Sequence, residues 1–175
     1  MALSKAIRAL IGLPALLLAA CDDGPKTVSH FSRPELIPSM LTSASTKGPA
    51  LVVIHGSPFP ERDEVTQTVV LETMMRAVTW RKTAFTLNAA EASEPETRII
   101  WAFGVADNLD ARKLCRGETP PAASDDKKIK VRAVFCARDQ LLSDVSGSIK
   151  TVAEPQDAMF DTLISQVTRT LLDKG

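Results

Sequence analysis

His55 and Ser57, two positions apart in the segment LVVIHGSPFP, are the side chains with the clearest potential for chemistry. A histidine can act as general base for a serine nucleophile when its ring reaches the hydroxyl and a third group orients it. The sequence reveals no such third group. We therefore favour a structural interpretation, in which His55 ends a buried strand and Gly56 turns the chain. His55, Ser57 and Phe59 remain a candidate turn for binding a ligand without catalysis.

A strand that ends in His-Gly also resembles the start of the oxyanion loop of α/β-hydrolases. That family carries its nucleophile in a G-x-S-x-G turn and needs a histidine after that serine. The chain contains no G-x-S-x-G, and no histidine follows His55. We carry no catalytic residue across from this resemblance. A hydrolase that uses His55 and Ser57 remains the alternative function.

The acidic and glycine residues do not match a metal site or a phosphate site. A calcium loop needs oxygen ligands at fixed alternate positions. That spacing is absent from the aspartates of one long segment, which are Asp107, Asp110, Asp125 and Asp126. A glycine loop that could hold a phosphate is missing too, and the chain has only 8 glycines. We expect no metal and no cofactor.

The first twenty residues have the composition of a secretory signal peptide. Lys5 and Arg8 precede an uncharged apolar run over residues 9–18, which is too short for an ordinary transmembrane helix. A positive start, a short apolar core and small residues at its end are typical of such a leader. Residues 1–20 are therefore excluded from the predicted fold.

The end of this leader, Leu18-Ala19-Ala20-Cys21, resembles the lipobox of bacterial lipoprotein precursors. The resemblance implies cleavage before Cys21, a diacylglycerol thioether on its sulfur and usually an acyl chain on its amino group. Each buried methylene contributes about 0.8 kcal/mol, so several chains should hold the protein firmly on membrane lipid. An ordinary secreted protein is the alternative. The rest of the chain resembles no family of known function.

Asp22 and Asp23 follow the predicted lipidation site directly. An aspartate in this place resembles the signal that retains enterobacterial lipoproteins in the inner membrane. We therefore expect the periplasmic face of the inner membrane rather than the outer membrane. The alternative is that the two acids only begin a solvated tether.

Cys115 and Cys136 are the two cysteines that remain besides Cys21, in a compartment that permits disulfides. Residues 128–136 alternate between apolar and polar positions, which places Cys136 on the strand face opposite the core. Cys115 lies in a predicted loop over residues 105–127. A loop of this length needs either a crosslink that holds it in place or a function of its own. We predict a disulfide; two free thiols or a metal pair are the alternatives.

Charge and length limit the classes of partner. Removal of Lys5 and Arg8 with the leader leaves 19 basic and 21 acidic side chains, so the chain has no electrostatic surface for nucleic acid. The remaining 155 residues suit a single domain with a hydrophobic core. We expect an envelope protein as the partner, but the sequence does not identify it.

The apolar pattern predicts a tether followed by one α+β domain. Residues 21–48 contain three prolines and no apolar period, and therefore predict a tether whose later part packs on the domain. Residues 49–175 predict, in order, a strand over 49–55, a helix over 61–80, strands over 83–88, 98–104, 128–136 and 141–149, and a helix over 155–174. The expected fold is a mostly antiparallel or mixed sheet of four or five strands with two helices on one face. The expected function is that of a membrane-anchored, non-catalytic binding or interaction domain.

Overall fold

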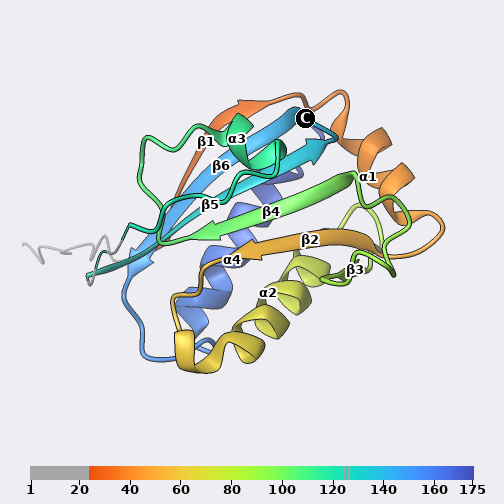
Figure 1. The fold of residues 1–175 in the computed structure, drawn as a ribbon. Coiled ribbons are helices and arrows are strands. Elements are labelled where there is room, and N and C mark those ends of the chain that lie inside the picture. Colours follow the sequence, from red (N-terminus) through yellow and green to blue (C-terminus); the bar gives the residue numbers. More distant parts are fainter. Residues whose placement is uncertain (1–23, 124, 126) are drawn as a thin grey trace, which may run out of the picture.

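The computed structural model describes residues 24–123, 125 and 127–175 (Figure 1). One mixed sheet of six strands has the order β1-β6-β5-β4-β2-β3. The strands are β1 (Lys26–Ser32), β2 (Ala50–His55), β3 (Phe85–Thr86), β4 (Thr97–Phe103), β5 (Lys128–Ala137) and β6 (Gln140–Lys150). Strands β1, β6, β5 and β4 pair antiparallel, whereas β2 runs parallel to both β4 and β3. The predicted α+β class is confirmed.

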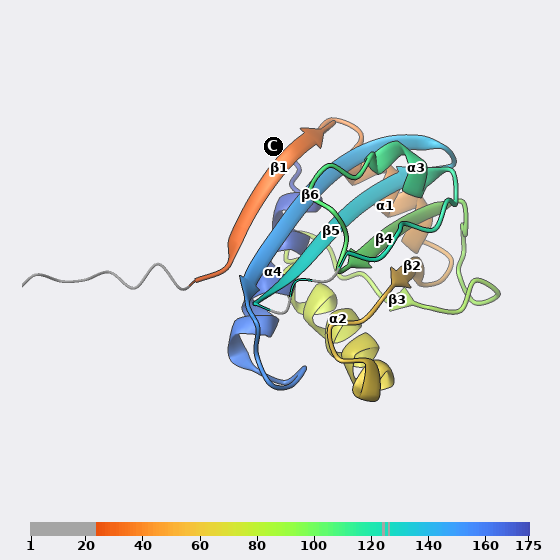
Figure 2. The same ribbon diagram turned by 60° about the vertical axis from the view of Figure 1, so that its left-hand side comes forward.

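Helices cover both faces of the sheet unequally. The main helices, α2 (Asp63–Ala77) and α4 (Ala158–Leu171), lie against one face together with α1 (Ile37–Ser45). A short helix, α3 (Ala111–Cys115), lies against the other face (Figure 1 and Figure 2). We call the face under α2 and α4 the inner face and the face under α3 the outer face. The structure thus has six strands and four α-helices in the described residues, more than the sequence predicted.

The core lies between the inner face and the helices. Strand β4 contributes Trp101, which is fully buried, and β5 contributes Phe135. The predicted C-terminal helix is present as α4. Its apolar side chains recur at helical spacing and are all buried: Phe160, Leu163, Ile164, Val167 and Leu171. It approaches β6 closely at Gly147, where an added Cβ would lie 2.6 Å from a methyl group of Val167.

The segment expected to be a tether is part of the folded domain. Strand β1 pairs with β6 along the edge of the sheet, and α1 buries Ile37 and Leu41 completely. The prediction failed at β1 because an edge strand covers little apolar surface, so its burial leaves no alternating pattern in the sequence. The domain therefore begins at about Lys26 rather than at residue 49.

The other elements differ from expectation mainly in length. A 3-10 turn, Pro60–Arg62, precedes α2, and β3 has only two residues where the sequence predicted a strand over 83–88. The predicted loop over 105–127 contains α3, whose first turn is capped by Asp110 accepting a hydrogen bond from the N–H of Arg112. The hairpin between β5 and β6 turns at Arg138, whose φ is 54°.

Candidate functional site

The turn after β2 is held together by its own residues. Gly56 has a φ of 70°, and a Cβ added there would lie 2.9 Å from the carbonyl oxygen of Phe103. The hydroxyl of Ser57 accepts a hydrogen bond of 3.2 Å from the backbone N–H of Phe59. The ring of Phe59 is buried and meets Phe160 edge to face, with ring centroids 5.3 Å apart. The turn therefore positions the start of α2 on the core.

His55 lies on the outer face, opposite Ala102 of β4. It is partly buried, and burial lowers the pKa of its imidazole, which favours the neutral ring. Among the described residues, the imidazole of His55 has no hydrogen-bond partner, and the hydroxyl of Ser57 bonds to the backbone instead. The structure does not join His55 and Ser57 into a base and nucleophile pair.

The predicted disulfide between Cys115 and Cys136 is present. The Cα atoms are 5.6 Å apart, and both residues are fully buried on the outer face. Around them lie the side chains of a small second core, which includes Ile100, Leu114 and Val134. Arg98 adds a hydrogen bond of 2.6 Å from its guanidinium to the carbonyl oxygen of Cys115. The disulfide thus holds α3 against β5 and the neighbouring strand β6.

A buried ion pair on the outer face was not predicted. Arg132 of β5 donates two hydrogen bonds, of 2.5 and 2.6 Å, to the two carboxylate oxygens of Asp144 in β6. Both side chains are more than 90% buried. The only signal in the sequence was one charge of each sign on two successive predicted strands. The register of those strands was needed to show that the two side chains meet. The pair crosslinks β5 and β6 beside the second core.

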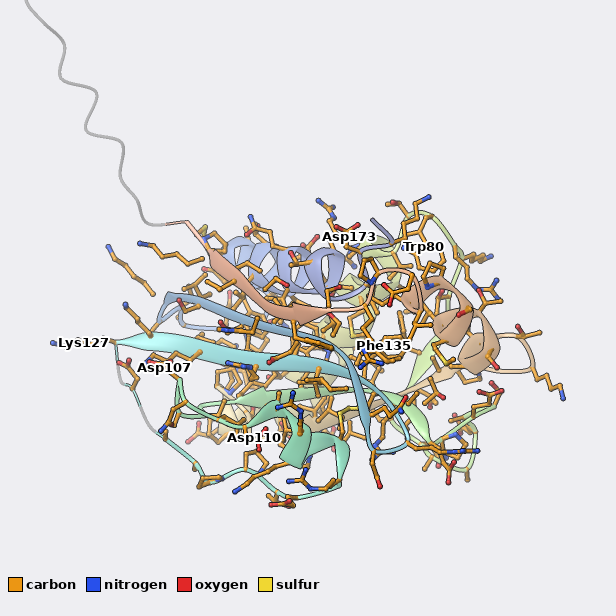
Figure 3. The ribbon with its side chains drawn as sticks, turned by 90° about the horizontal axis from the view of Figure 1, so that it is seen from above. Trp80, Asp107, Asp110, Lys127, Phe135 and Asp173 are labelled. Atoms are coloured by element: carbon orange, nitrogen blue, oxygen red, sulfur yellow. A yellow bond between two sulfur atoms is a disulfide. The ribbon has the colours of Figure 1, made fainter. Side chains whose placement is uncertain are left out.

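A basic hollow opens on the same face, beyond α3. We call it the lysine groove; it has a volume of about 210 Å³, and its lining includes Lys26, Lys128, Lys130, Ser148 and Asp107. Lys26 and Lys130 both lie opposite Ser148 in the register, so β1, β6 and β5 each contribute one side chain to a single row. Figure 3 shows Asp107 near Lys127, which lies at the tip of the sheet where β5 begins.

A larger cavity lies at the opposite end of the sheet. It has a volume of about 830 Å³ and is lined by α1 residue Met40, by the start of β4 around Glu96, and by the β5–β6 turn around Arg138. We call it the distal cavity. Glu96 accepts a hydrogen bond of 2.8 Å from the backbone N–H of Arg138 and one of 3.0 Å from its side chain. These two bonds hold the turn in its left-handed conformation.

The described part of the chain contains no group of three or more histidine, cysteine, aspartate or glutamate residues that could hold a metal ion. No helix among these residues combines the length and apolar character needed to cross a bilayer. The lipobox, Cys21, Asp22 and Asp23 lie outside the described residues.

Comparison with known proteins identifies similar folds only. No protein-family model matches the sequence, and no curated protein matches it significantly. A variant of the PelC dodecamer from Paraburkholderia phytofirmans aligns over 85% of this chain and 98% of its own, with a TM-score of 0.45 and 10% identity. Another crystal form of the PelC dodecamer from that organism aligns over 85% and 97%, with a TM-score of 0.43 and 10% identity. At these values the likeness carries no conclusion about function, partners or assembly.

Proposed function

We propose that this protein is a lipoprotein of the bacterial cell envelope, anchored by acylated Cys21, whose domain binds another envelope protein without catalysis. The lipobox supports the anchor. The turn at His55, Ser57 and Phe59 supports the absence of catalysis, because Ser57 and Phe59 are engaged in holding the entry to α2. The two acids after Cys21 support the periplasmic face of the inner membrane over the outer membrane.

The short distance along the chain between the anchor and β1 carries this proposal. Lys26, the first residue of β1, follows Cys21 by five residues. A fully extended chain spans at most about 3.6 Å per residue, so the Cα atom of Lys26 lies within about 18 Å of the Cα atom of acylated Cys21. The domain is therefore held against the bilayer surface and not on a long flexible arm.

The same geometry separates two ends of the domain. Strand β6 has 11 residues, which span about 36 Å at about 3.3 Å per residue. Its last residues lie beside Lys26, and its first residues form the turn at the distal cavity. The distal cavity is therefore the larger hollow on the part of the domain farthest along the sheet from the anchor. We propose that the protein partner binds there.

Two measurements test the proposal. Labelled palmitate should be incorporated into the wild type and not into a Cys21→Ser variant; a wild type that never incorporates the label contradicts the anchor. A photoreactive residue at Asp139, exposed at the distal cavity, should give a discrete adduct with an envelope protein. The matched control is the same residue at Glu72, exposed on α2. Equal adducts from both positions, or none from Asp139, would count against the distal cavity.

Membrane fractionation tests the location separately. We expect the protein in the inner-membrane fraction, and a shift to the outer membrane when Asp22 and Asp23 are both replaced by serine. Native protein in the outer membrane would contradict the sorting proposal while leaving the anchor and the binding proposal intact.

A further inference from the structure

We propose that a second hollow, next to the distal cavity, binds an acidic side chain of the protein partner through two arginines. This inference rests on the proposed binding function and names the chemistry of the partner. We call the hollow the arginine groove. It has a volume of about 270 Å³ and is lined by Phe31, Arg33, Arg112, Asp139, Gln140 and Leu141.

The arginine groove lies on the outer face, at the end of the sheet remote from the anchor. Arg33 directly follows β1, and Arg112 belongs to α3. The end of β1 and α3 lie toward the same end of the sheet in both Figure 1 and Figure 2. Asp139 and Gln140, at the turn between β5 and β6, line this groove as well as the distal cavity. A partner bound at the distal cavity would therefore reach the arginine groove across this turn.

The two guanidinium groups have no acidic partner in the part of the chain that the structure describes. Arg62 and Arg116, which are exposed elsewhere, each pair with a glutamate, at 3.1 and 3.0 Å. Arg33 and Arg112 are exposed too, but neither forms an ion pair with a described carboxylate, even with Asp139 of the same groove. Two arginines and one aspartate give the lining a net charge of +1. The groove therefore offers guanidinium donors to an anion.

The fold holds both arginines in place. The guanidinium carbon of Arg33 lies 5.6 Å from the ring centroid of Phe31, and the backbone N–H of Arg33 donates a hydrogen bond of 2.9 Å to the carbonyl oxygen of Leu142. Arg112 lies in the first turn of α3, whose last residue, Cys115, is crosslinked to β5. Binding a ligand here therefore costs less conformational entropy than binding it between two mobile segments.

A carboxylate beside an apolar group fits this lining best. Guanidinium groups bind carboxylates and phosphates through paired N–H donors. The half-buried side chains of Phe31 and Leu141 add apolar surface, which favours an amphipathic segment over an inorganic ion. A lipid headgroup is disfavoured, because Arg33 lies seven residues beyond Lys26, about 23 Å at about 3.3 Å per residue, and membrane charge is screened within about 8 Å at physiological salt. An aspartate or glutamate flanked by apolar residues meets these conditions.

Fluorescence anisotropy with defined peptides tests the chemistry of the groove. The acylated mature protein in phosphatidylcholine nanodiscs is titrated with labelled, amidated Leu-Glu-Leu-Glu-Leu, and with Leu-Gln-Leu-Gln-Leu as the matched uncharged probe. We expect the acidic peptide to bind about tenfold more tightly, the equivalent of about 1.4 kcal/mol, which two exposed ion pairs can supply. This preference should vanish at about 1 M salt.

Matched double variants locate the binding. Arg33→Gln with Arg112→Gln should remove the tenfold preference. Arg62→Gln with Arg169→Gln removes the same charge from exposed arginines of the 3-10 turn and α4, and should bind like the wild type. Equal affinity for the two peptides, no binding of either, or an equal loss in both double variants would overturn the proposal. Displacement of the peptide by an equal concentration of inorganic phosphate would identify a small-anion site and overturn it as well.

Asp139→Asn should change the affinity in the opposite direction. The substitution removes the negative charge from the lining, so the acidic peptide should bind about threefold more tightly and the uncharged peptide should bind as before. Weaker binding of the acidic peptide to this variant would contradict the proposed charge recognition.

Photocrosslinking separates this inference from the proposed function. With the photoreactive residue at position 139, Arg33→Gln with Arg112→Gln should reduce the adduct with the partner, whereas the control double variant should not. An adduct that is unchanged in both would overturn the acidic partner and leave the proposed binding function intact. No adduct in any of these proteins would contradict the proposed partner site and, with it, the acidic partner, even if the peptide binds.

Discussion

Replacing both Cys115 and Cys136 by serine removes the covalent link between α3 and the outer face of the sheet. The two cysteines are 21 positions apart. For a closed loop of this size, the chain-entropy model gives a loss of about 3 kcal/mol from the free energy of unfolding. Because each kcal/mol shifts the melting temperature of a domain of this size by about 2–4 °C, the double variant should melt about 6–12 °C below the wild type.

The second core determines how far the effect spreads. Ile100 and Val134 are at most 2% exposed, and they share the second core with Leu114 of α3. Without the bond, the hydrogen bond from Arg98 to the Cys115 carbonyl is the main polar link that holds α3 in place. We therefore expect faster amide hydrogen exchange in residues 111–115 and in the facing part of β5, and unchanged exchange in α4.

Differential scanning calorimetry and alkylation measure these effects. Reductant added to unfolded protein should lower the melting temperature of the wild type toward that of the variant, and should leave the variant unchanged. A variant that melts within about 2 °C of the wild type would refute the reasoning, because a loop-closure term of about 3 kcal/mol would then be absent. Two freely alkylatable thiols in the non-reduced wild-type protein would refute the bond itself.

Three further predictions concern single residues. Gly56→Ala should lower the free energy of unfolding by at least about 1–2 kcal/mol, because alanine is strained in the left-handed region and its Cβ would meet the Phe103 carbonyl; denaturant unfolding with no change in midpoint would contradict this. Arg132→Met should lower the free energy of unfolding by about 3–5 kcal/mol, because it leaves the Asp144 carboxylate buried and unpaired. Adding Asp144→Leu to that variant should recover much of the lost free energy in the same denaturant assay. Burial lowers the pKa of His55, so the unfolded chain binds its proton at higher pH than the folded chain does, and stability should fall as pH decreases from about 7 to about 5. His55→Gln should flatten this slope in thermal melts across that range, and an unchanged slope would show that His55 does not contribute.

The sequence by itself determined the elements whose own apolar pattern indicates which of their residues are buried. Helix α4 repeats its apolar residues at helical spacing, and β2 and β4 are nearly unbroken apolar runs. The alternation of β5 was enough to place Cys136 on the face opposite the core, and an even pair of cysteines then predicted the disulfide. These predictions succeeded because a pattern of burial within one segment reports the contacts of that segment.

Only the tertiary structure decided the features that depend on partners far along the chain. Strand β1 is polar and exposed, and its hydrogen bonds come from β6, more than a hundred residues later. Arg132 and Asp144 form a pair because the β5–β6 register places their strands in step. The lysine groove exists because that register and the β1–β6 pairing place Lys26 and Lys130 on either side of Ser148. Register is set by the whole sheet and its turns, so no local pattern in these segments could reveal which side chains would meet.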